Sequence, residues 1–505
     1  MHERATKRAG ITAAFLGALA VLGGWATHGA DAQQRDAGAR DAARPTAAAG
    51  PAAAGATAVE ARGSALERMA IRRERLDNGL RVVLNPDATV PTVAIAVYYD
   101  VGSRNEVRGR SGFAHLFEHM MFQGSANVDR GEHFSLIMNR GGSMNGTTSE
   151  DRTNYFETLP ANELELGLFL ESDRMRSLAI TQSNFENQRI VVIQERQQNY
   201  DNRPYALSFL RINELAYGDY WPYAHSTIGD TQDLVDAPLS AVQDFWNSYY
   251  APNNAVLVIS GDFDPEQAMQ MVRRYFGDIA SRDVPAYQPS ALSPQTAERV
   301  DTIPDAIADV PAFHVAYHIP PSREEDHYAL EMLSLALGDG ESSRLYQELV
   351  KQRELVSEIY IATDDRRGPD LFSIFALLQE GHTSEEVRPF IYAAFERIAR
   401  EGIPARELEK LRNRIRAAFV FGLQSNMDRA KNLAEFELYW GDAGLIRAEL
   451  DRYLAVTSDD IQRVAGRYFA ETNRTVLDVV PAPAAEAAQP ETSAAPAAAG
   501  QGGAR

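Results

Sequence analysis

The sequence predicts an α+β fold of two homologous domains, each an antiparallel sheet flanked by helices. Strand-length apolar runs alternate with longer segments of helical periodicity from about residue 70 to residue 481. The order of these elements recurs in the second half of that region. The segments YYAPNNAVLVISGDF (249–263) and RYFAETNRTVLDVVPA (467–482) also match in an aromatic pair, an alanine, an asparagine-containing turn and an apolar strand. Duplication of one unit predicts this match, although helix–turn–strand endings are common in unrelated domains.

The first predicted domain, 66–280, begins with a hairpin. Residues 75–87, RLDNGLRVVLNPD, place an Asn-Gly turn between two strand-like runs. Residues 92–103, TVAIAVYYDVGS, follow as a buried strand. The remaining expected elements are helices 111–123 and 131–141, two strands within 143–160, helices 161–177 and 183–200, and a helix–strand–helix unit over 245–279.

A stretch rich in Pro and Ala predicts a linker at 281–298, followed by the second domain at 299–481. This domain repeats the order of the first. Its expected elements are strand 312–320, helix 326–338, strand 370–379, long helices over about 384–440 and the final strand within 467–482.

Both ends of the chain have compositions that differ from a folded core. Residues 1–32 combine a positive start, an uncharged apolar run and small residues at Ala30 and Ala32, which predicts a signal peptide cleaved after Ala32. The alternative is an uncleaved membrane anchor, although the apolar run is short for a membrane span. Residues 33–65 and 482–505 are rich in Ala, Pro and Gly and are expected to be disordered.

Charge and cysteine content restrict the expected partners and compartment. The chain has 50 Lys and Arg against 70 Asp and Glu, a net charge of -20. Nucleic-acid binding requires clustered basic side chains, so we expect no nucleic-acid partner. The absence of cysteine excludes disulfides and a cysteine-linked lipid anchor. Together with the signal peptide, this composition predicts a bacterial periplasmic protein.

The segment SGFAHLFEHMMFQGS (111–125) concentrates three polar side chains in an apolar helical background. His115 and His119 are four residues apart, so they project from one face of a helix with Glu118 beside them. Two imidazole nitrogens at this spacing can bind one Zn²⁺, and the carboxylate can act as a base on a water molecule. The alternative is a helix with two incidental histidines.

This H-x-x-E-H order resembles the pitrilysin/insulinase family of zinc peptidases, the inverted zincins. The resemblance extends from about residue 70 to residue 481 and includes YYDVGSRNE (98–106) and PYAHSTIGD (222–230). It is greatest for the two-domain bacterial branch that is similar to mitochondrial processing peptidase. The resemblance implies half of a clamshell around a chamber, one Zn²⁺ per chain, and Glu118 as the general base that passes a proton to the leaving amine.

The resemblance also implies a third metal ligand, a Glu about 75 residues downstream on another helix. Glu195 lies 76 positions after His119 and is the expected ligand. Glu186 is the competing acid, and a surface position is the alternative for Glu195. Family members often have another Glu seven residues before the ligand, where this chain has Gln188. An amide there can orient a ligand by hydrogen bonding but adds no negative charge.

Three further residues match positions that hold substrate in the family. Asn145, within GGSMNGTTSEDRTNYF (141–156), resembles a residue of the edge strand that pairs with an extended peptide. The alternative is a glycine-rich hairpin turn. Arg353 and Tyr360 are seven residues apart, like a family pair that contacts substrate and supports the oxyanion. The alternative is a surface pair with helical spacing.

The function implied by the resemblance is zinc-dependent endopeptidase activity on short or unfolded polypeptides within the chamber. A non-catalytic subunit of the same fold, acting in assembly or substrate capture with a partner peptidase, is the alternative. A zinc hydrolase with a non-peptide substrate is a more distant one. We expect a homodimer, because this chain carries both the metal helix and the Arg353/Tyr360 pair, or else a heterodimer with a related subunit that lacks the motif.

Overall fold

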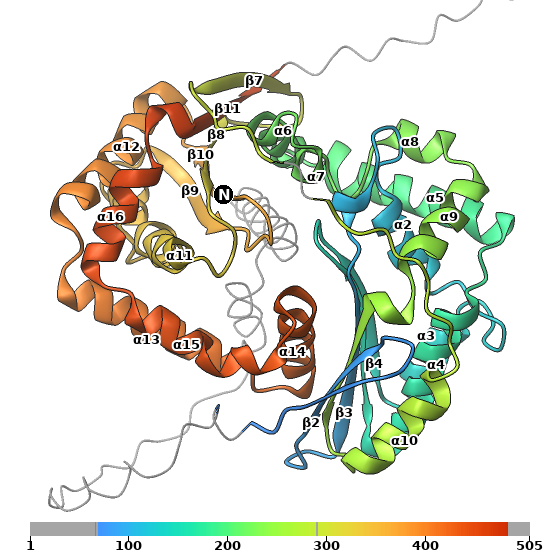
Figure 1. Cartoon of the computed structure of the whole chain (residues 1–505). Helices are drawn as coiled ribbons and strands as arrows, with labels where there is room; N and C mark the ends of the chain where they lie inside the picture. The colour runs from blue at the N-terminus through green and yellow to red at the C-terminus, as the bar shows by residue number, and fades with distance from the viewer. Residues whose placement is uncertain (1–65, 67–68, 289–290, 483–505) are drawn as a thin grey trace, which may run out of the picture.

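The computed structural model describes residues 66, 69–288 and 291–482, which form two lobes with one β-sheet each (Figure 1). This arrangement confirms the predicted α+β class. The predicted signal peptide, the segment 33–65 and all but the first residue of 482–505 lie outside the described residues. Among the described residues, no helix combines the length and apolarity that a membrane crossing needs.

The first sheet has six strands in the order β1-β2-β6-β3-β5-β4. β2 and β6 pair in parallel, and the other neighbours are antiparallel. The sheet is therefore antiparallel, as predicted, except for one parallel pair. After β5 the chain passes through several helices and returns to insert β6 between β2 and β3. The strands are β1 (Arg72–Arg75), β2 (Arg81–Pro86), β3 (Thr92–Tyr99), β4 (Ser143–Thr148), β5 (Thr153–Pro160) and β6 (Ala255–Gly261).

The second sheet has the order β7-β11-β8-β10-β9 and again contains one parallel pair, β7 with β11. The five strands of the second sheet correspond in order to β2, β6, β3, β5 and β4 of the first sheet, as duplication predicts, and β1 has no counterpart. Its strands are β7 (Arg299–Asp305), β8 (Ala312–Ile319), β9 (Val356–Thr363), β10 (Asp370–Leu378) and β11 (Arg474–Pro481). The described part of 281–298 has neither helix nor strand, as expected of a linker.

Helices surround both sheets (Figure 1). Those that precede the linker are α2 (Phe113–Met120), α3 (Glu132–Met138), α4 (Leu164–Ser177), α5 (Gln182–Arg196), α6 (Ala206–Tyr217), α7 (Trp221–Ala224), α8 (Thr231–Asp236), α9 (Leu239–Tyr249) and α10 (Pro265–Phe276). Those that follow it are α11 (Glu325–Gly338), α12 (Ser384–Glu401), α13 (Ala405–Phe421), α14 (Asn426–Trp440), α15 (Ile446–Ala455) and α16 (Ser458–Tyr468). The helices predicted at 111–123, 131–141, 161–177 and 183–200 are confirmed, with ends that differ by a few residues.

Buried side chains on both faces of β3 show why the sheet needs two helical layers. Val93 and Ile95 belong to a core cluster with residues of α2, α4, α9 and α10. Their neighbours Ala94 and Ala96 point to the opposite face, where they pack with Leu433 and other residues of α14. Successive strand residues face opposite sides of a sheet, so apolar side chains at consecutive positions require a cover on each side.

The two lobes exchange one helix each. α14 follows the linker but contacts β3 and β6 of the first sheet. α6 precedes the linker but contacts β8 and β11 of the second sheet, where Ile212 and Tyr217 pack against Leu477. The strands of each sheet come from one side of the linker, whereas the cores are built from both parts of the chain.

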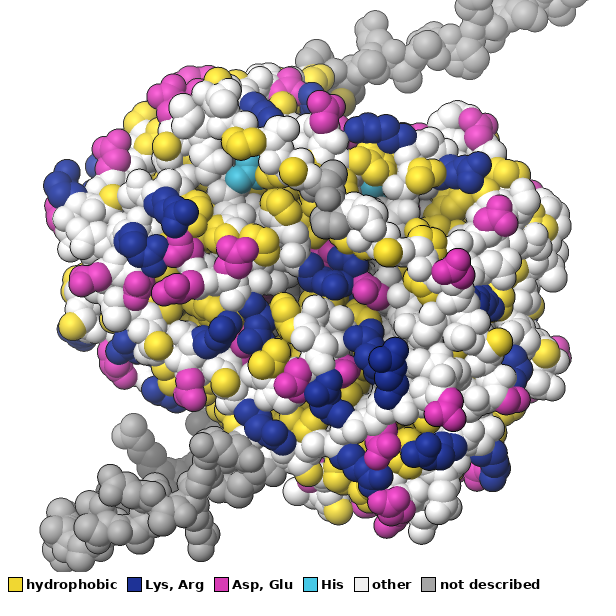
Figure 2. All heavy atoms as spheres, viewed as in Figure 1, with side chains coloured by type: hydrophobic (Ala, Val, Ile, Leu, Met, Phe, Trp, Pro, Cys, Tyr) yellow, Lys and Arg dark blue, Asp and Glu magenta, His cyan; other side chains and the backbone are white. Residues whose placement is uncertain are grey.

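The face drawn in Figure 2 shows Lys and Arg side chains interspersed with Asp and Glu. This mixture is typical of a solvated protein surface.

Candidate metal centre

α2 begins at a close approach of two backbone segments. Gly112 precedes the helix at φ +85°, and a Cβ atom added to Gly229 would lie only 2.4 Å from the Gly112 Cα. The Glu106 carboxylate accepts hydrogen bonds from the backbone N–H groups of Gly112 and Ala114, both at 2.8 Å. His225 Nε2 lies 3.0 Å from the same carboxylate. Glu106 therefore caps a helix that has no side-chain cap of its own.

The apolar side of α2 fixes the direction of its polar side. The residues that enter the core are Phe113, Ala114, Leu116, Phe117 and Met120. His115, Glu118 and His119 occupy the remaining side of the helix and face α5 and β4, both of which contact α2.

Glu195 of α5 meets both histidines. Its Oε2 atom lies 3.1 Å from His119 Nε2 and 3.8 Å from His115 Nε2. All three donor atoms lie within 4.8 Å of one another. Zinc bound to nitrogen and oxygen at ~2.0–2.2 Å in a tetrahedral arrangement would separate its donor atoms by ~3.3–3.6 Å. The side chains present therefore fit a zinc ion with small adjustments.

The electrostatics of the three residues also suit a cation. Burial and the neighbouring His119 lower the pKa of His115 to about 4, so its imidazole is neutral at pH 7 with a lone pair available. Burial would raise the pKa of Glu195, but the hydrogen bond with His119 and the nearby histidine charges hold it below its usual value. Burial disfavours protonated His119, yet its contacts with Glu195 leave its pKa raised.

Glu118 lies beside this group and is held by the first sheet. Its Oε2 atom accepts a hydrogen bond from Thr148 Oγ1 at 2.7 Å. The backbone of β4 approaches closely, because a Cβ added to Gly146 would lie 3.0 Å from Glu118 Cγ. Burial raises the pKa of Glu118, partly offset by Thr148 and by the positive charge of Arg152. A carboxylate with a raised pKa is a stronger proton acceptor.

The structure distinguishes the two acids on α5. Glu195 faces the histidines, whereas Glu186 is paired with Arg189 and accepts a hydrogen bond from Gln182 at 2.7 Å. Gln188 is buried and donates to Asn187 Oδ1 at 2.8 Å, and its amide helps to raise the pKa of His119, which agrees with an amide that orients a ligand. Asn199, in the π-helical turn that follows α5, helps to lower the pKa of Glu195.

Asn145 is exposed on β4, the outermost strand of the first sheet. Its Oδ1 atom accepts a hydrogen bond from its neighbour Gly146 N at 3.0 Å. The residue therefore lies on an open sheet edge next to Glu118, rather than in a hairpin turn.

Arg353 and Tyr360 do not share a helix. A π-helical segment ends at Gln352, Arg353 follows it, and Tyr360 is on β9, the outer strand of the second sheet. The helical spacing considered for this pair is therefore wrong. Arg353 lies over the Phe390 ring, 4.0 Å from its centroid, and the Tyr360 hydroxyl donates to Glu358 at 2.7 Å. Both residues belong to the second lobe, whereas the metal helix belongs to the first.

Several residues that shape the centre were missed in the sequence. Glu106 and His225 lie in YYDVGSRNE and PYAHSTIGD, whose similarity to the family gave the only signal for them. Thr148 and Arg152 lie in the segment 141–156, whose resemblance to the family was noted only for Asn145. Asn199 had no signal, because its effect on the centre depends on helix packing.

Comparisons with known proteins place the chain in a family. The description "Insulinase (Peptidase family M16)" matches residues 81–227, and "Peptidase M16 inactive domain" matches residues 237–415. A relative from Helicobacter pylori, "Zinc protease PqqE", is 30% identical over 412 residues, which are 80% of this chain and 92% of the relative. The chain belongs to peptidase family M16. A Mycobacterium bovis relative of this M16 protein, "Uncharacterized zinc protease Mb2805c", is 29% identical over 405 residues, 79% of this chain and 90% of the relative.

Solved structures agree with the M16 assignment. A protease from Helicobacter pylori superposes with a TM-score of 0.78 at 29% identity, covering 82% of this chain and all of the other. Pitrilysin has a TM-score of 0.68 at 18% identity, and the match covers 83% of this M16 chain but 46% of pitrilysin. The second comparison is evidence of a common fold only, and it agrees with the prediction that this chain corresponds to half of a clamshell.

Proposed function

We propose that this M16 chain is a zinc-dependent endopeptidase that hydrolyses short or unfolded polypeptides. The observation that carries the proposal is that donor atoms of His115, His119 and Glu195 lie within 4.8 Å of one another. Glu118 is on α2 with the two histidines but is not one of the three donors. Relatives named zinc proteases support the same class of chemistry.

His115, His119 and Glu195 would hold the zinc ion. When bound, zinc supplies a Lewis acid that polarises a peptide carbonyl and makes water more acidic. Glu118 takes a proton from the attacking water and gives it to the leaving amine. Thr148 fixes the position of the Glu118 carboxylate through its hydrogen bond, and burial keeps that carboxylate basic.

The edge of β4 would hold the substrate. An extended peptide can add a strand to an open sheet edge, because the outer backbone groups of that strand lack a partner strand. Asn145 is exposed on this edge, and Gly146 brings the β4 backbone close to Glu118. A peptide paired with β4 would therefore have one of its bonds near the base.

A non-catalytic subunit that acts in assembly or substrate capture with a partner peptidase is the competing function. The two differ in the role of Glu118, so Glu118→Gln provides the test. We expect unchanged zinc content and an approximately 100- to 10,000-fold lower rate of peptide hydrolysis, because the substitution removes a base but no ligand. A library of peptides analysed by mass spectrometry measures the rate. Wild-type protein that binds zinc but cleaves no peptide would favour the non-catalytic subunit.

We also propose export to the periplasm through the signal peptide at 1–32. One structural neighbour is described as the periplasmic protease PqqL from Escherichia coli, at 16% identity. Mass spectrometry of the protein from its native cell should find Gln33 as the first residue. Retention of the apolar segment would instead support the membrane-anchor alternative.

For assembly, we propose a homodimer, with a heterodimer containing a motif-less subunit as the alternative. The chain carries both the metal helix and the Arg353/Tyr360 pair, so two copies would supply both features twice in a closed symmetric dimer.

A further inference from the structure

The second lobe repeats the local architecture around the candidate metal centre. In the first lobe, β3 is followed by α2, α3 and the β4–β5 hairpin; in the second, β8 is followed by α11, the π-helical segment Tyr346–Gln352 and the β9–β10 hairpin. α11 therefore occupies in its domain the place that α2 occupies in the first. This correspondence permits a comparison of the two helices position by position.

α11 carries possible metal ligands where α2 carries its histidines. His115 and His119 are the third and seventh residues of α2, which begins at Phe113. His327 and Glu331 are the third and seventh residues of α11, which begins at Glu325. The four-residue spacing again directs both side chains to one face of a helix.

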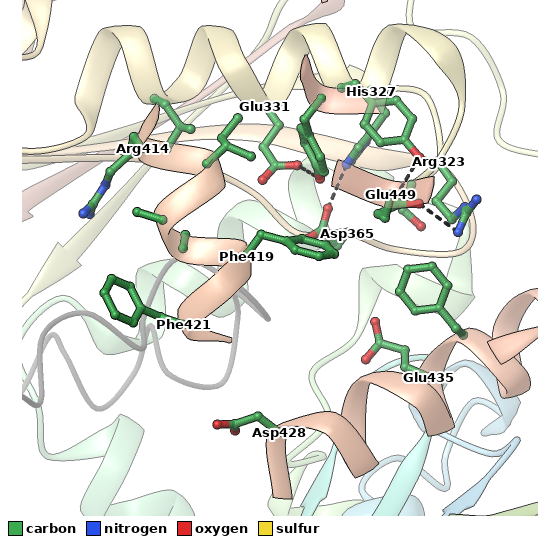
Figure 3. A pocket seen from close by; sticks show the side chains of 18 of the residues that line it. Arg323, His327, Glu331, Asp365, Arg414, Phe419, Phe421, Asp428, Glu435 and Glu449 are labelled. Atoms are coloured by element: carbon green, nitrogen blue, oxygen red, sulfur yellow. Dashed lines mark hydrogen bonds and ion pairs between the residues drawn. The ribbon is translucent and has the colours of Figure 1, made fainter. Parts of the chain in front are cut away.

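A third donor comes from the β9–β10 hairpin. Asp365 Oδ1 lies 2.7 Å from His327 Nε2. The donor atoms of His327, Glu331 and Asp365 all lie within 4.8 Å of one another. Figure 3 shows these side chains directed toward the same space from α11 and the hairpin. The Tyr453 hydroxyl donates to Glu331 Oε2, which leaves the other oxygen of this carboxylate available.

In the second lobe, the third possible ligand does not come from the helix that corresponds to α5. α5 and α13 are each the second helix after their hairpins. α5 provides Glu195, whereas none of the α13 residues that line the cavity is acidic. These residues are Arg414, Ile415, Ala417, Ala418, Phe419 and Phe421. Asp365 therefore supplies from the hairpin a carboxylate that α13 does not supply.

These residues border a cavity of about 530 Å³ (Figure 3). The cavity has an apolar wall that includes Phe419, Phe436 and Trp440. It leaves room for a water molecule or a small ligand to complete the coordination of an ion. His327 itself is only 1% exposed, and its Nδ1 atom has no hydrogen-bond partner among the described residues.

Among the described residues, no arginine forms an ion pair with either carboxylate of the triad. Arg323 pairs with Glu449 at 3.0 Å, and Arg414 pairs with Asp339 at 2.8 Å. Glu331 and Asp365 bring two carboxyl groups to His327, and one divalent cation would neutralise both in their ionised forms. The competing occupant is a proton on His327, which would act as the counter-ion of Asp365 alone.

We infer that His327, Glu331 and Asp365 form a second metal site, which binds a divalent transition metal ion in the lobe matched by the M16 inactive domain. One imidazole and two carboxylates suit Zn²⁺ or Mn²⁺. The sixth residue of α11 is the buried Leu330, where α2 has Glu118. The site thus lacks a base at the position of the proposed peptidase base. It binds metal without contributing peptide hydrolysis, and the inference does not rest on the proposed function.

Metal stoichiometry in the full chain tests the inference. Protein stripped with a chelator is dialysed against buffered Zn²⁺, with Mn²⁺ as a parallel probe, and bound metal is counted by mass spectrometry. We expect about two zinc ions per wild-type chain, about one in either Glu331→Gln or His119→Gln, and none in the double variant. Glu435→Gln is the matched control, because Glu435 lines the same cavity outside the triad; it should keep about two.

Each single variant retains one site as an internal measure of folding. If Glu331→Gln does not fold, wild type and His119→Gln still decide the question. One zinc ion per wild-type chain and none in His119→Gln would overturn the inference. Protonated His327 as the counter-ion of Asp365 would then be the remaining explanation. Anomalous diffraction at the zinc edge gives an independent measurement. A peak bounded by His327, Glu331 and Asp365 supports the site, and its absence from a crystal with zinc at His119 contradicts it.

Discussion

Glu118 and Glu195, the two acidic side chains beside His119, have pKa values that are shifted in opposite directions. Burial dominates at Glu118 and raises its pKa, whereas the histidine contacts of Glu195 outweigh burial and lower its pKa. A lowered pKa keeps Glu195 ionised, as a metal ligand must be. A raised pKa makes Glu118 the better proton acceptor. The environments of the two residues thus support different roles for the same chemical group.

Glu195→Gln should weaken zinc binding, whereas Glu186→Gln should leave it unchanged. Only Glu195 contacts the histidines; Glu186 lies at the surface with Arg189. We expect loss of affinity beyond the ~10- to 100-fold typical of residues that only orient a ligand. Competition with a chromogenic chelator measures it. If zinc affinity follows Glu186, the ligand assignment is wrong.

A second buried cluster in the first lobe also has three possible donor groups, but its surroundings do not suit a metal ion. His133, Glu157 and Glu171 bring donor atoms within 4.8 Å of one another. Both oxygens of Glu171, however, accept hydrogen bonds from Arg174. A guanidinium so close repels a metal cation. Burial is the largest effect on Glu157 and raises its pKa to about 8, so a proton neutralises this carboxylate.

This shift makes the stability of the protein depend on pH. An unfolded Glu has a pKa of ~4.3, so between there and about 8 the folded state binds a proton that the unfolded state has lost. The contribution of Glu157 is complete below the unfolded pKa and declines as pH rises through this window, by up to ~1.4 kcal/mol per pH unit. Glu157→Gln cannot ionise. Its free energy of unfolding, relative to wild type, should increase from pH 5 to pH 8.

Denaturant titrations at several pH values measure this difference. Because His133 is present in both proteins, its own titration largely cancels. A difference between Glu157→Gln and wild type that stays constant with pH would show that Glu157 is ionised in the folded protein.

At the scale of residues, sequence reasoning succeeded where the relevant geometry is local. The positions of His115, Glu118 and His119 on one side of a helix follow from their spacing alone. Glu195 required the family resemblance, because 76 residues separate it from His119 and no spacing rule covers that distance. Thr148 and Arg152 lie in the segment 141–156 that resembles the family, but their roles beside Glu118 could not be predicted, because this proximity depends on how β4 and β5 pair.

At the scale of elements, α2 depends on a cap built from two distant loops. Glu106 binds two backbone N–H groups at its start, and His225 braces the carboxylate. β3 was predictable from its continuous apolar run, and α10 from the helical spacing of its apolar residues. The parallel pairs β2–β6 and β7–β11 were not, because strand order depends on the path of the chain through the intervening helices.

Glu106→Gln should lower the free energy of unfolding by about 1–3 kcal/mol, because one of the buried partners of the carboxylate loses its acceptor. It should also increase zinc loss, since the first turn of α2 carries His115. Thermal unfolding and zinc retention are the measurements. Glu132→Gln is the control: Glu132 accepts from Asp129 N at the start of α3 but is exposed, so a loss below about 1 kcal/mol is expected. Equal effects of the two substitutions would contradict a special role for Glu106.

At the scale of the whole molecule, each part of the chain contributes one helix to the core of the other lobe. The exchange of α6 and α14 covers apolar faces of both sheets, so neither part of the chain contains a complete core. The duplication was visible in the sequence, but this exchange was not, because amphipathic helices do not specify which of two similar sheets they cover. The same exchange makes the two lobes a single structural unit, within which the metal helix and the Arg353/Tyr360 pair belong to different lobes.

The proposed homodimer predicts complementation between two inactive chains. One chain carries Glu118→Gln and the other carries Arg353→Ala with Tyr360→Phe. Each homodimer should be inactive, because every site lacks either its base or the substrate contacts supplied by the partner. A mixed dimer has one complete site, since its intact metal helix faces an intact Arg/Tyr pair. With random pairing of equal amounts, half of the dimers are mixed, so activity should recover to about a quarter of wild type.

Exchange of subunits must be demonstrated in the same samples, for example by native mass spectrometry of chains with different isotopic labels. The control is a mixture in which one chain carries all three substitutions and the other carries Glu118→Gln, because no pairing then restores a base. Recovery only in the first mixture places the Arg/Tyr contacts in trans. A wild-type protein that is fully active as a strict monomer, or a mixture that stays inactive despite complete exchange, would exclude the trans arrangement and leave the heterodimer or a self-sufficient chain.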